Sequence, residues 1–276
     1  MPTNLHIMKK IIITTTLIGL LILLGAIVFY GMNPSQYASK QTSLFLSINH
    51  LLANAGNLFW QNITALGDGL LLFPLLSFLI LKNIRAWAAF FGAIPMSTFL
   101  SHAAKAFFAM PRPAAIIEHD HINIIGHALT GATSLPSGHT ITIFTTISIL
   151  IWLLLKGEIK VKYPMLWSIS LLAIAILVAL SRIAVGAHWP FDLVLGAMFG
   201  SVGGLSGLIL TYKYTAWWHW MTATTAKYIH LSILFTLSIA MLVEYAHLAI
   251  TWLAFMVVII VMFKLLTMKE NHVLHL

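Results

Sequence analysis

The sequence contains no cysteine and few charged residues. Without cysteine, the chain has neither a disulfide framework nor a thiolate metal site. Charged residues make up 8% of its 276 residues and hydrophobic residues 60%, whereas soluble domains carry about 25% charged residues. This composition excludes a soluble globular protein and identifies an integral membrane protein. The net charge of +8 therefore does not indicate a nucleic-acid partner, and the positions of the basic residues matter more than their sum.

Long apolar runs predict membrane-spanning helices. The first run, Ile11 to Tyr30, follows Lys9 and Lys10 and has about the 20 residues that a span needs. It lacks a convincing cleavage site, so it reads as an uncleaved helix rather than a signal peptide. The mixed segment at 33–62 has amphipathic spacing and is predicted to lie in the membrane interface. Further spans are predicted at about residues 63–81, 86–104, 137–155, 163–180, 189–212, 228–243 and 247–263.

These runs predict an all-α, polytopic membrane helical bundle of eight helices in a single domain, residues 1–276. Its orientation follows from the basic residues. With the N-terminus in the cytoplasm, eleven of the 15 Lys and Arg residues lie at the inner ends of the helices, which agrees with the positive-inside rule. The outer side then holds the other four: Lys40, Lys105, Arg112 and Arg182.

Three polar segments meet at the outer membrane boundary in this orientation. Residues 105–113 follow the third span, residues 136–139 open the fourth, and residues 181–192 join the fifth and sixth. In the last segment His188 and Asp192 are four residues apart, so on a helix they would share one face. Pro190 favours a helix start close by. The alternative interpretation is a juxtamembrane loop with ordinary interfacial polar residues.

The polar groups of these segments suit a phosphate. Lys105, Arg112 and Arg182 supply three cations, and the planar fork of arginine favours bidentate phosphate contacts. Ser137 and Gly138 lie at a predicted helix start, where free backbone N–H groups and the helix dipole favour an anion. The pattern therefore predicts a phosphate cradle built from these five residues.

Two histidines and a carboxylate could transfer the phosphoryl group. His188 would attack phosphorus to give a phosphohistidine, and Asp192 would fix the tautomer of its ring. His139 would protonate the leaving oxygen and later activate water. Hydrolysis of a phosphate monoester requires a barrier reduction of about 20 kcal/mol or more. One oxyanion donor contributes about 3–4 kcal/mol, so several donors are needed.

The three segments also resemble a known family. Lys105-x6-Arg112-Pro113, Pro136-Ser137-Gly138-His139 and Ser181-Arg182-x5-His188-x3-Asp192 are similar in order and spacing to the signature motifs of the type 2 phosphatidic acid phosphatase superfamily. That superfamily includes class A bacterial acid phosphatases and vanadium haloperoxidases. The resemblance implies the same residue roles, with no metal and no cofactor. It implies a six-helix membrane form whose phosphatase core lies at about residues 63–212. The two predicted helices at about 228–263 depart from that common form.

The predicted function is a metal-independent membrane phosphatase acting on a lipid phosphate or lipid diphosphate. The lipid would remain in the bilayer and present its headgroup at the outer face of a bacterial cytoplasmic membrane. The sequence leaves open an isoprenoid diphosphate, a phosphatidyl phosphate or a phosphorylated glycolipid. Alternatives are a lipid phosphotransferase that uses the same phosphohistidine, and a transporter, for which no inverted repeat is visible.

Polar residues outside the motifs allow two interpretations each. Asp68, inside a predicted span, either caps a helix or pairs with a cation of the site. The loop before the fourth span carries a cluster that could bind a metal, although a lid over the substrate headgroup is favoured. That cluster comprises Glu118, His119, Asp120, His121 and His127.

Overall fold

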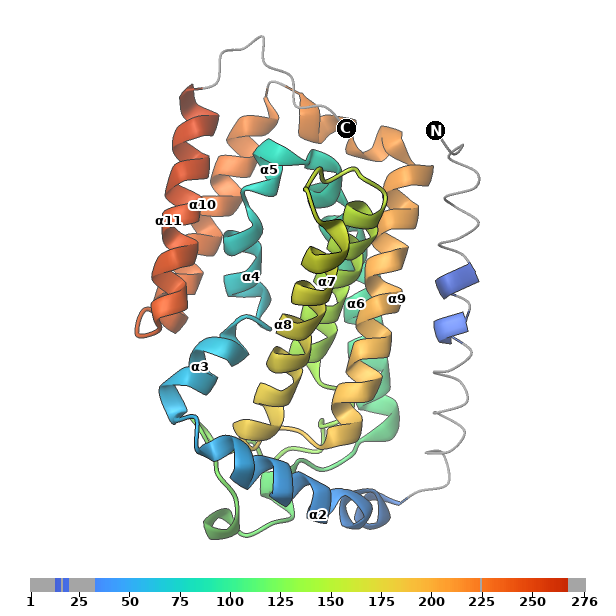
Figure 1. Cartoon of the computed structure of the whole chain (residues 1–276), viewed down its shortest axis with the longest axis vertical. Helices are drawn as coiled ribbons and strands as arrows, with labels where there is room; N and C mark the ends of the chain where they lie inside the picture. The colour runs from blue at the N-terminus through green and yellow to red at the C-terminus, as the bar shows by residue number, and fades with distance from the viewer. Residues whose placement is uncertain (1–12, 16, 20–32, 224, 268–276) are drawn as a thin grey trace.

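The computed structural model describes residues 13–15, 17–19, 33–223 and 225–267 (Figure 1). Within these residues the regular secondary structure is helical, with no strand, which confirms the predicted all-α class. Most of the predicted first span at residues 11–30 lies outside the described residues. The total of eight spans therefore stays a prediction.

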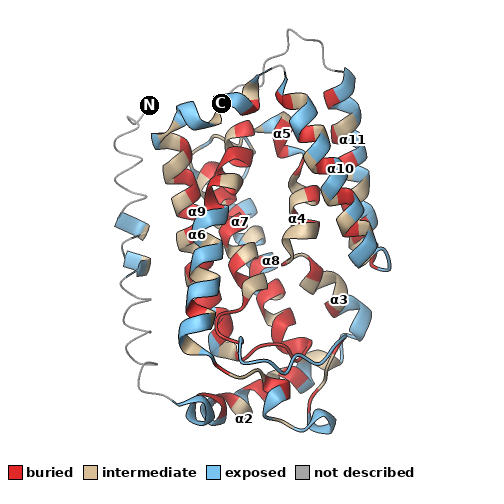
Figure 2. Ribbon diagram, turned by 180° about the vertical axis from the view of Figure 1, so that it is seen from behind, coloured by how far each residue is buried: buried red, intermediate tan, exposed pale blue. Residues whose placement is uncertain are grey.

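Four long helices form the centre of the bundle: α6 (Ile84–Phe108), α7 (Gly138–Leu155), α8 (Pro164–Ala184) and α9 (Pro190–Lys213). They run side by side, with α9 packed against both α6 and α7 and with α8 packed against α7 (Figures 1 and 2). Five described helices are long and apolar enough to cross a membrane, namely α7, α8, α9, α10 (Ala226–Tyr245) and α11 (Ala249–Thr267). The bundle is therefore built to stand across a bilayer.

Glycines allow α9 to approach its neighbours closely. A Cβ atom added to Gly200 would lie 2.5 Å from the Ile141 carbonyl oxygen, and one added to Gly204 would lie 2.5 Å from that of Thr145. Both carbonyls belong to α7. Small residues four apart let two membrane helices bring their backbones together. This contact places the start of α7 directly beside the start of α9.

The predicted second span is not one straight helix. It is divided into α3 (Asn57–Ala65), α4 (Gly69–Leu76) and α5 (Leu79–Lys82), with a bend of 67° after α3. Asp68 lies at the break and caps α4, because its Oδ1 accepts from the Leu70 N–H at 2.8 Å. This confirms the capping interpretation of Asp68, which forms no ion pair among the described residues.

The two C-terminal helices form a hairpin that packs on the broken helix. The Tyr245 hydroxyl donates to Asp68 Oδ2 at 2.8 Å, and the Ile250 N–H donates to Asn62 Oδ1 at 3.0 Å. An apolar cluster that includes Leu71 of α4 and Leu248 of the turn lies beneath these bonds. The turn between α10 and α11, which the sequence predicted, is thereby fixed to the α3–α4 break.

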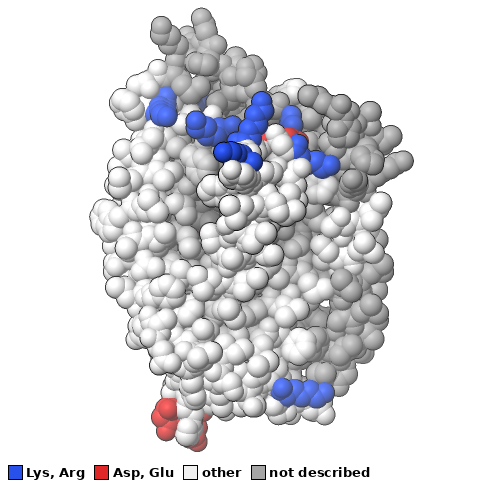
Figure 3. Space-filling model, viewed as in Figure 1, with Lys and Arg blue, Asp and Glu red and all other residues white. Residues whose placement is uncertain are grey.

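The two ends of the bundle differ in charge. Helix α2 (Pro34–Ala53) lies across one end (Figure 1), and its predicted helical character is confirmed. Most of the Lys and Arg side chains on the visible face gather at the opposite end, with an acidic group among them, whereas the α2 end shows an acidic patch and a separate basic group (Figure 3). Helix η3 (Thr215–Thr222) carries three tryptophans: Trp217, Trp218 and Trp220.

Candidate active site

His188 and Asp192 form a buried hydrogen-bonded pair. His188 Nδ1 lies 3.0 Å from Asp192 Oδ2, and their side chains are 3% and 0% exposed. A carboxylate accepts hydrogen bonds, so Nδ1 carries the proton and Nε2 keeps its lone pair. The sequence predicted this contact from a shared helix face, and that reason is wrong. His188 precedes Trp189, the extended N-cap residue of α9, while Asp192 lies in the first turn.

Asp192 accepts from three further donors. The Tyr37 hydroxyl donates to Oδ1 at 2.5 Å, the Ser134 hydroxyl to Oδ2 at 2.6 Å and the Trp189 N–H to Oδ2 at 2.9 Å. Neither Tyr37 nor Ser134 is among the site residues predicted from the sequence. A signal for Tyr37 exists, because Tyr37 and Gln41 are four residues apart on the buried face of α2. Buried polar groups need hydrogen-bond partners, which places that face against protein rather than lipid.

Arg112 faces the free nitrogen of His188. Its Nη1 lies 3.4 Å from His188 Nε2 and donates to the Ala187 carbonyl at 3.1 Å. The Trp189 indole N–H donates to the Pro111 carbonyl at 2.8 Å, which ties this segment to the start of α9. A guanidinium has donors only, so it leaves the Nε2 lone pair unprotonated and can bind oxygens of a group that approaches it.

Lys105, Ser137 and Gly138 meet at the N-terminus of α7. A Cβ atom built on Gly138 would lie 3.7 Å from Lys105 Nζ, so the ammonium stands beside the first turn. Ser137 is the N-cap, and its Oγ accepts from the Thr140 hydroxyl at 3.0 Å. Its backbone N–H donates to the Asp192 carbonyl at 3.1 Å. The N–H groups that remain for an anion are those of the first helical turn.

His139 and Arg182 lie against the break between α3 and α4. A Cβ atom added to Gly67 would lie 2.7 Å from His139 Cβ, so only glycine permits this approach. Arg182 is 6% exposed, and its Nη1 donates to the Thr64 hydroxyl. Its Nε has no hydrogen-bond partner among the described residues. Thr64, which the sequence analysis did not name, orients this guanidinium.

The structure thus brings the predicted residues to one end of the bundle, next to α2. Their charges are close enough to act on one another, since the charges of Arg112, Arg182 and Asp192 all act on the Lys105 ammonium. A cluster of three cations around a neutral histidine favours binding of an anion. The eight residues gathered here are Lys105, Arg112, Ser137, Gly138, His139, Arg182, His188 and Asp192.

Burial sets the protonation of two groups outside the spanning helices. It lowers the pKa of His188 to about 4, although the hydrogen bond and charge of Asp192 act in the opposite direction. His188 is therefore neutral at neutral pH, and a neutral imidazole has a lone pair that can act as a nucleophile. Burial and the charge of Asp192 raise the pKa of Tyr37, so this phenol stays protonated and remains a donor.

The loop residues that were predicted as one polar cluster are divided in the structure. Glu118, Asp120 and His121 place their ligand atoms within 4.8 Å of one another, and all three are exposed. His119 lies near a backbone carbonyl instead, and His127 lines a separate cavity. The prediction of a reaction without metal stays a prediction.

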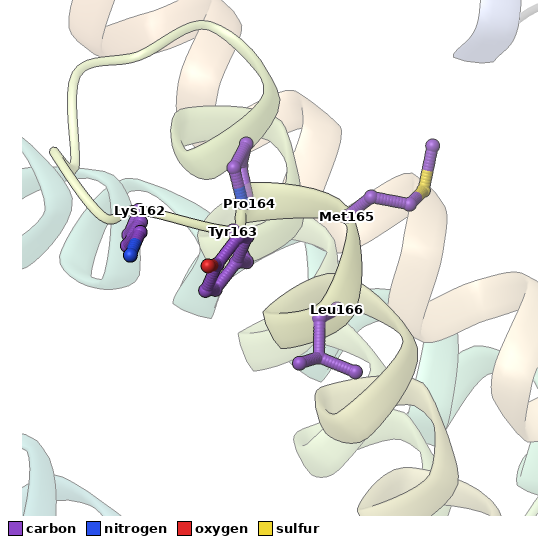
Figure 4. Close-up of a pocket in the computed structure, with 5 residues that line it drawn as sticks. All are labelled: Lys162, Tyr163, Pro164, Met165 and Leu166. Carbon is purple, nitrogen blue, oxygen red and sulfur yellow. The ribbon is translucent and has the colours of Figure 1, made fainter.

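A second hollow lies at the start of α8. It is lined by the consecutive residues 162–166 (Figure 4). Its charged group, Lys162, stands over the Tyr163 ring at 5.2 Å from the centroid. The remaining three side chains are those of Pro164, Met165 and Leu166, which carry no polar group. This hollow therefore has no converging set of catalytic groups.

The fold and this site together define a polytopic helical membrane protein in which cationic and histidine side chains gather in an arrangement suited to an anion. The chain belongs to the PAP2 superfamily, whose family model matches residues 86–223, half of the sequence. This confirms the family that the three motifs predicted, and the match contains all eight predicted site residues.

Relatives and solved structures agree with this assignment. The chain is 34% identical over 120 residues to the Escherichia coli K12 protein named "Putative undecaprenyl-diphosphatase YbjG", a match that covers 43% of this chain and 53% of that one. The chain thus spans about half the length of this curated relative. The crystal structure of Aquifex aeolicus LpxE matches with a TM-score of 0.50 and 31% identity, over 61% of this chain and 94% of that one.

A second solved structure supports the fold alone. It is the first transmembrane PAP2 type phosphatidylglycerolphosphate phosphatase from Bacillus subtilis, with a TM-score of 0.50 and 21% identity. The match covers 73% of this chain and 95% of that one. The predicted architecture, an all-α membrane helical bundle, is therefore confirmed.

Proposed function

We propose that this protein is a membrane phosphatase that hydrolyses a lipid diphosphate, or a related lipid phosphate, through a phosphohistidine. The observation that carries the proposal is the environment of His188. Its Nδ1 is tied to Asp192 at 3.0 Å, and its Nε2 faces Arg112 at 3.4 Å. A neutral imidazole with one nitrogen fixed and the other directed at a guanidinium is arranged to attack a bound phosphate.

The first step forms a bond between His188 Nε2 and phosphorus while the bond from phosphorus to the leaving oxygen breaks. His139 donates its proton to that oxygen, and Asp192 stabilises the positive charge on the phosphorylated ring. The cations Lys105, Arg112 and Arg182 compensate the charge on the transferring oxygens. Because attack is in line, the leaving oxygen lies on the side opposite His188.

The second step releases phosphate. His139, now neutral, takes a proton from water as the water oxygen attacks phosphorus. The bond from phosphorus to Nε2 breaks, and His188 returns to its neutral form with Nδ1 still bonded to Asp192. The same residues thus serve both steps, and the proton that His139 gave to the leaving group is replaced by one from water.

The relative's printed name supports a lipid diphosphate as the substrate class. The name of YbjG describes an undecaprenyl-diphosphatase, and the two chains are 34% identical over 120 residues. We infer that the lipid keeps its tails in the bilayer, because the site lies at one end of apolar helices. The concentration of basic residues at the opposite end supports an active site facing the exterior of a bacterial inner membrane.

The proposal is tested with purified protein in detergent, farnesyl diphosphate as the substrate and phosphate release as the readout. We expect turnover in the presence of EDTA, and loss of at least about 10³-fold with His188→Ala, which removes the nucleophile. When the terminal phosphate of farnesyl diphosphate carries ³²P, the label should appear on the wild-type protein as an acid-labile, base-stable adduct. Near-normal turnover by His188→Ala would contradict the assignment. Transfer of label to an added acceptor lipid in place of water would favour the phosphotransferase.

A further inference from the structure

A cavity of about 250 Å³ opens beside His139 and Arg182. Three segments that lie far apart in the sequence form the rest of its wall. Gln61 comes from α3, His127 from the loop between α6 and α7, and His247 from the turn between α10 and α11. Two of these three, Gln61 and His247, lie outside the region that the family model matches.

The cavity lies on the leaving-group side of the site. His139 lines it, whereas His188 does not. In the proposed mechanism the leaving oxygen must be opposite His188 and within reach of His139. The part of the substrate that follows this oxygen therefore extends into the cavity.

The polar side chains in its wall are available to a ligand. The side chains of Gln61, His127 and His247 make no hydrogen bond to protein in the part of the chain that the structure describes. Arg182 contributes a cation, and its buried Nε is also unpartnered within that part. Leu129 and Leu248 supply apolar surface in the same wall. Donors and a cation next to apolar surface match an anionic group that continues into a hydrocarbon chain.

The turn that carries His247 is held firmly in place. The Tyr245 hydroxyl donates a hydrogen bond to Asp68 at 2.8 Å. In the first turn of α11, the Ile250 N–H donates to the Asn62 side chain at 3.0 Å. Both acceptors belong to the segment around the α3–α4 break, which also contacts His139 through Gly67. The hairpin therefore holds His247 at a fixed position relative to the general acid.

We propose that this cavity is the leaving-group subsite and that it binds the proximal phosphate of a lipid diphosphate. Gln61, His127 and His247 donate hydrogen bonds to that phosphate. The α10–α11 hairpin then acts as a specificity element added to the family's catalytic core. This inference rests on the proposed function and assigns its substrate class to named residues.

The test compares three substrates that differ in the leaving group. The leaving group of farnesyl diphosphate is farnesyl monophosphate, a phosphate ester. That of lysophosphatidic acid is a monoacylglycerol, a glycerol ester, and that of p-nitrophenyl phosphate is a phenol. The variants are Gln61→Glu, which places a negative charge in the wall, and His247→Ala. His121→Ala is the matched control, because His121 lies exposed on the loop outside the cavity.

For both variants we expect the ratio of kcat/KM for farnesyl diphosphate to kcat/KM for p-nitrophenyl phosphate to fall about tenfold or more. This is the effect of losing one hydrogen bond to a charged group. The same ratio for lysophosphatidic acid should change less, and His121→Ala should change neither ratio. Equal losses for both lipids would overturn the phosphate assignment.

Unchanged ratios in Gln61→Glu and His247→Ala would overturn the subsite while leaving the proposed function intact. A wild-type protein without activity on any of the three substrates would overturn the proposed function, and the subsite with it. Activity on p-nitrophenyl phosphate in each variant reports that the protein has folded, so a loss of ratio is not a loss of structure.

Discussion

At the scale of residues, the carboxylate of Asp192 organises the site. Four donors converge on it, from Tyr37, Ser134, Trp189 and His188. These hydrogen bonds hold the orientation of the carboxylate, and the carboxylate in turn holds the orientation of the His188 imidazole. Tyr37 is therefore a positioning residue that acts on His188 through Asp192.

Tyr37→Phe should lower kcat about tenfold with little change in KM, because a hydrogen bond to a charged group is lost while the phosphate contacts remain. The acid limb of kcat/KM should also shift. Since the pKa of His188 is about 4, wild-type activity should persist between pH 5 and 6.5. Without the Tyr37 donor, Asp192 stabilises the imidazolium more strongly, so the pKa of His188 and the acid limb should both rise.

The measurement is kcat/KM against pH for both proteins with one substrate, so that the substrate's own ionisation is common to both curves. Tyr163→Phe is the control, because Tyr163 is 55% exposed and lies outside the site. A reduced rate with an unmoved acid limb would show that Tyr37 has only a structural role. A wild-type acid limb near pH 6.5 would show that His188 is not the buried neutral group described here.

At the scale of elements, the contact between α7 and α9 sets the distance between two motifs. Ser137 and His139 open α7, and Asp192 lies in the first turn of α9. The glycines of α9 let the two backbones touch. At the N-terminal end of this contact, the Ser137 N–H donates a hydrogen bond to the Asp192 carbonyl at 3.1 Å. The spacing of the catalytic groups therefore depends on residues that have no polar side chain.

Gly204→Ala should destabilise the protein by about 1–3 kcal/mol, because its methyl group would lie 2.5 Å from the Thr145 carbonyl oxygen and force the helices apart. Thermal unfolding in detergent, followed by near-UV circular dichroism, measures the change. Gly69→Ala is the control, since its methyl group would meet only the Phe73 ring at 3.7 Å. An unfolding temperature equal to that of the wild type would show that the α7–α9 contact can expand freely.

At the scale of the whole molecule, the two ends of the bundle are chemically distinct. The site and α2 lie at one end, and most of the lysines and arginines of the visible face gather at the other (Figure 3). Under the positive-inside rule this distribution supports the proposed position of the site on the outer face. A lipid diphosphate presented at that face could reach the site without crossing the bilayer.

The absence of cysteine from the chain allows a direct test of this orientation. Single variants Asp120→Cys and Lys160→Cys place exposed thiols in the loops at the two ends. In intact cells a membrane-impermeant maleimide should label Asp120→Cys, whereas Lys160→Cys should be labelled only after lysis. Labelling of Lys160→Cys alone in intact cells would reverse the proposed orientation.

The helices themselves were predictable where apolar runs are long and uninterrupted. The predicted spans at 137–155, 163–180 and 189–212 correspond to α7, α8 and α9. The break after α3 was missed because the mean hydropathy of a long apolar run stays high despite the short Gly67-Asp68-Gly69 interruption. The predicted span at 189–212 correctly begins after His188. The shared-face argument for His188 and Asp192 was nevertheless wrong, since four-residue spacing alone does not show that both residues lie on a helix.

The sequence by itself determined the membrane class, the family and the eight residues that gather at the site, because these depend on composition and on motifs whose spacing is local. Only the tertiary structure decided which groups support them. Tyr37 and Asp192 are 155 residues apart, and Tyr245 of the hairpin and Asp68 of the α3–α4 break are 177 apart. No local pattern encodes such contacts. They arise because buried polar groups must find partners wherever the packed helices bring them together.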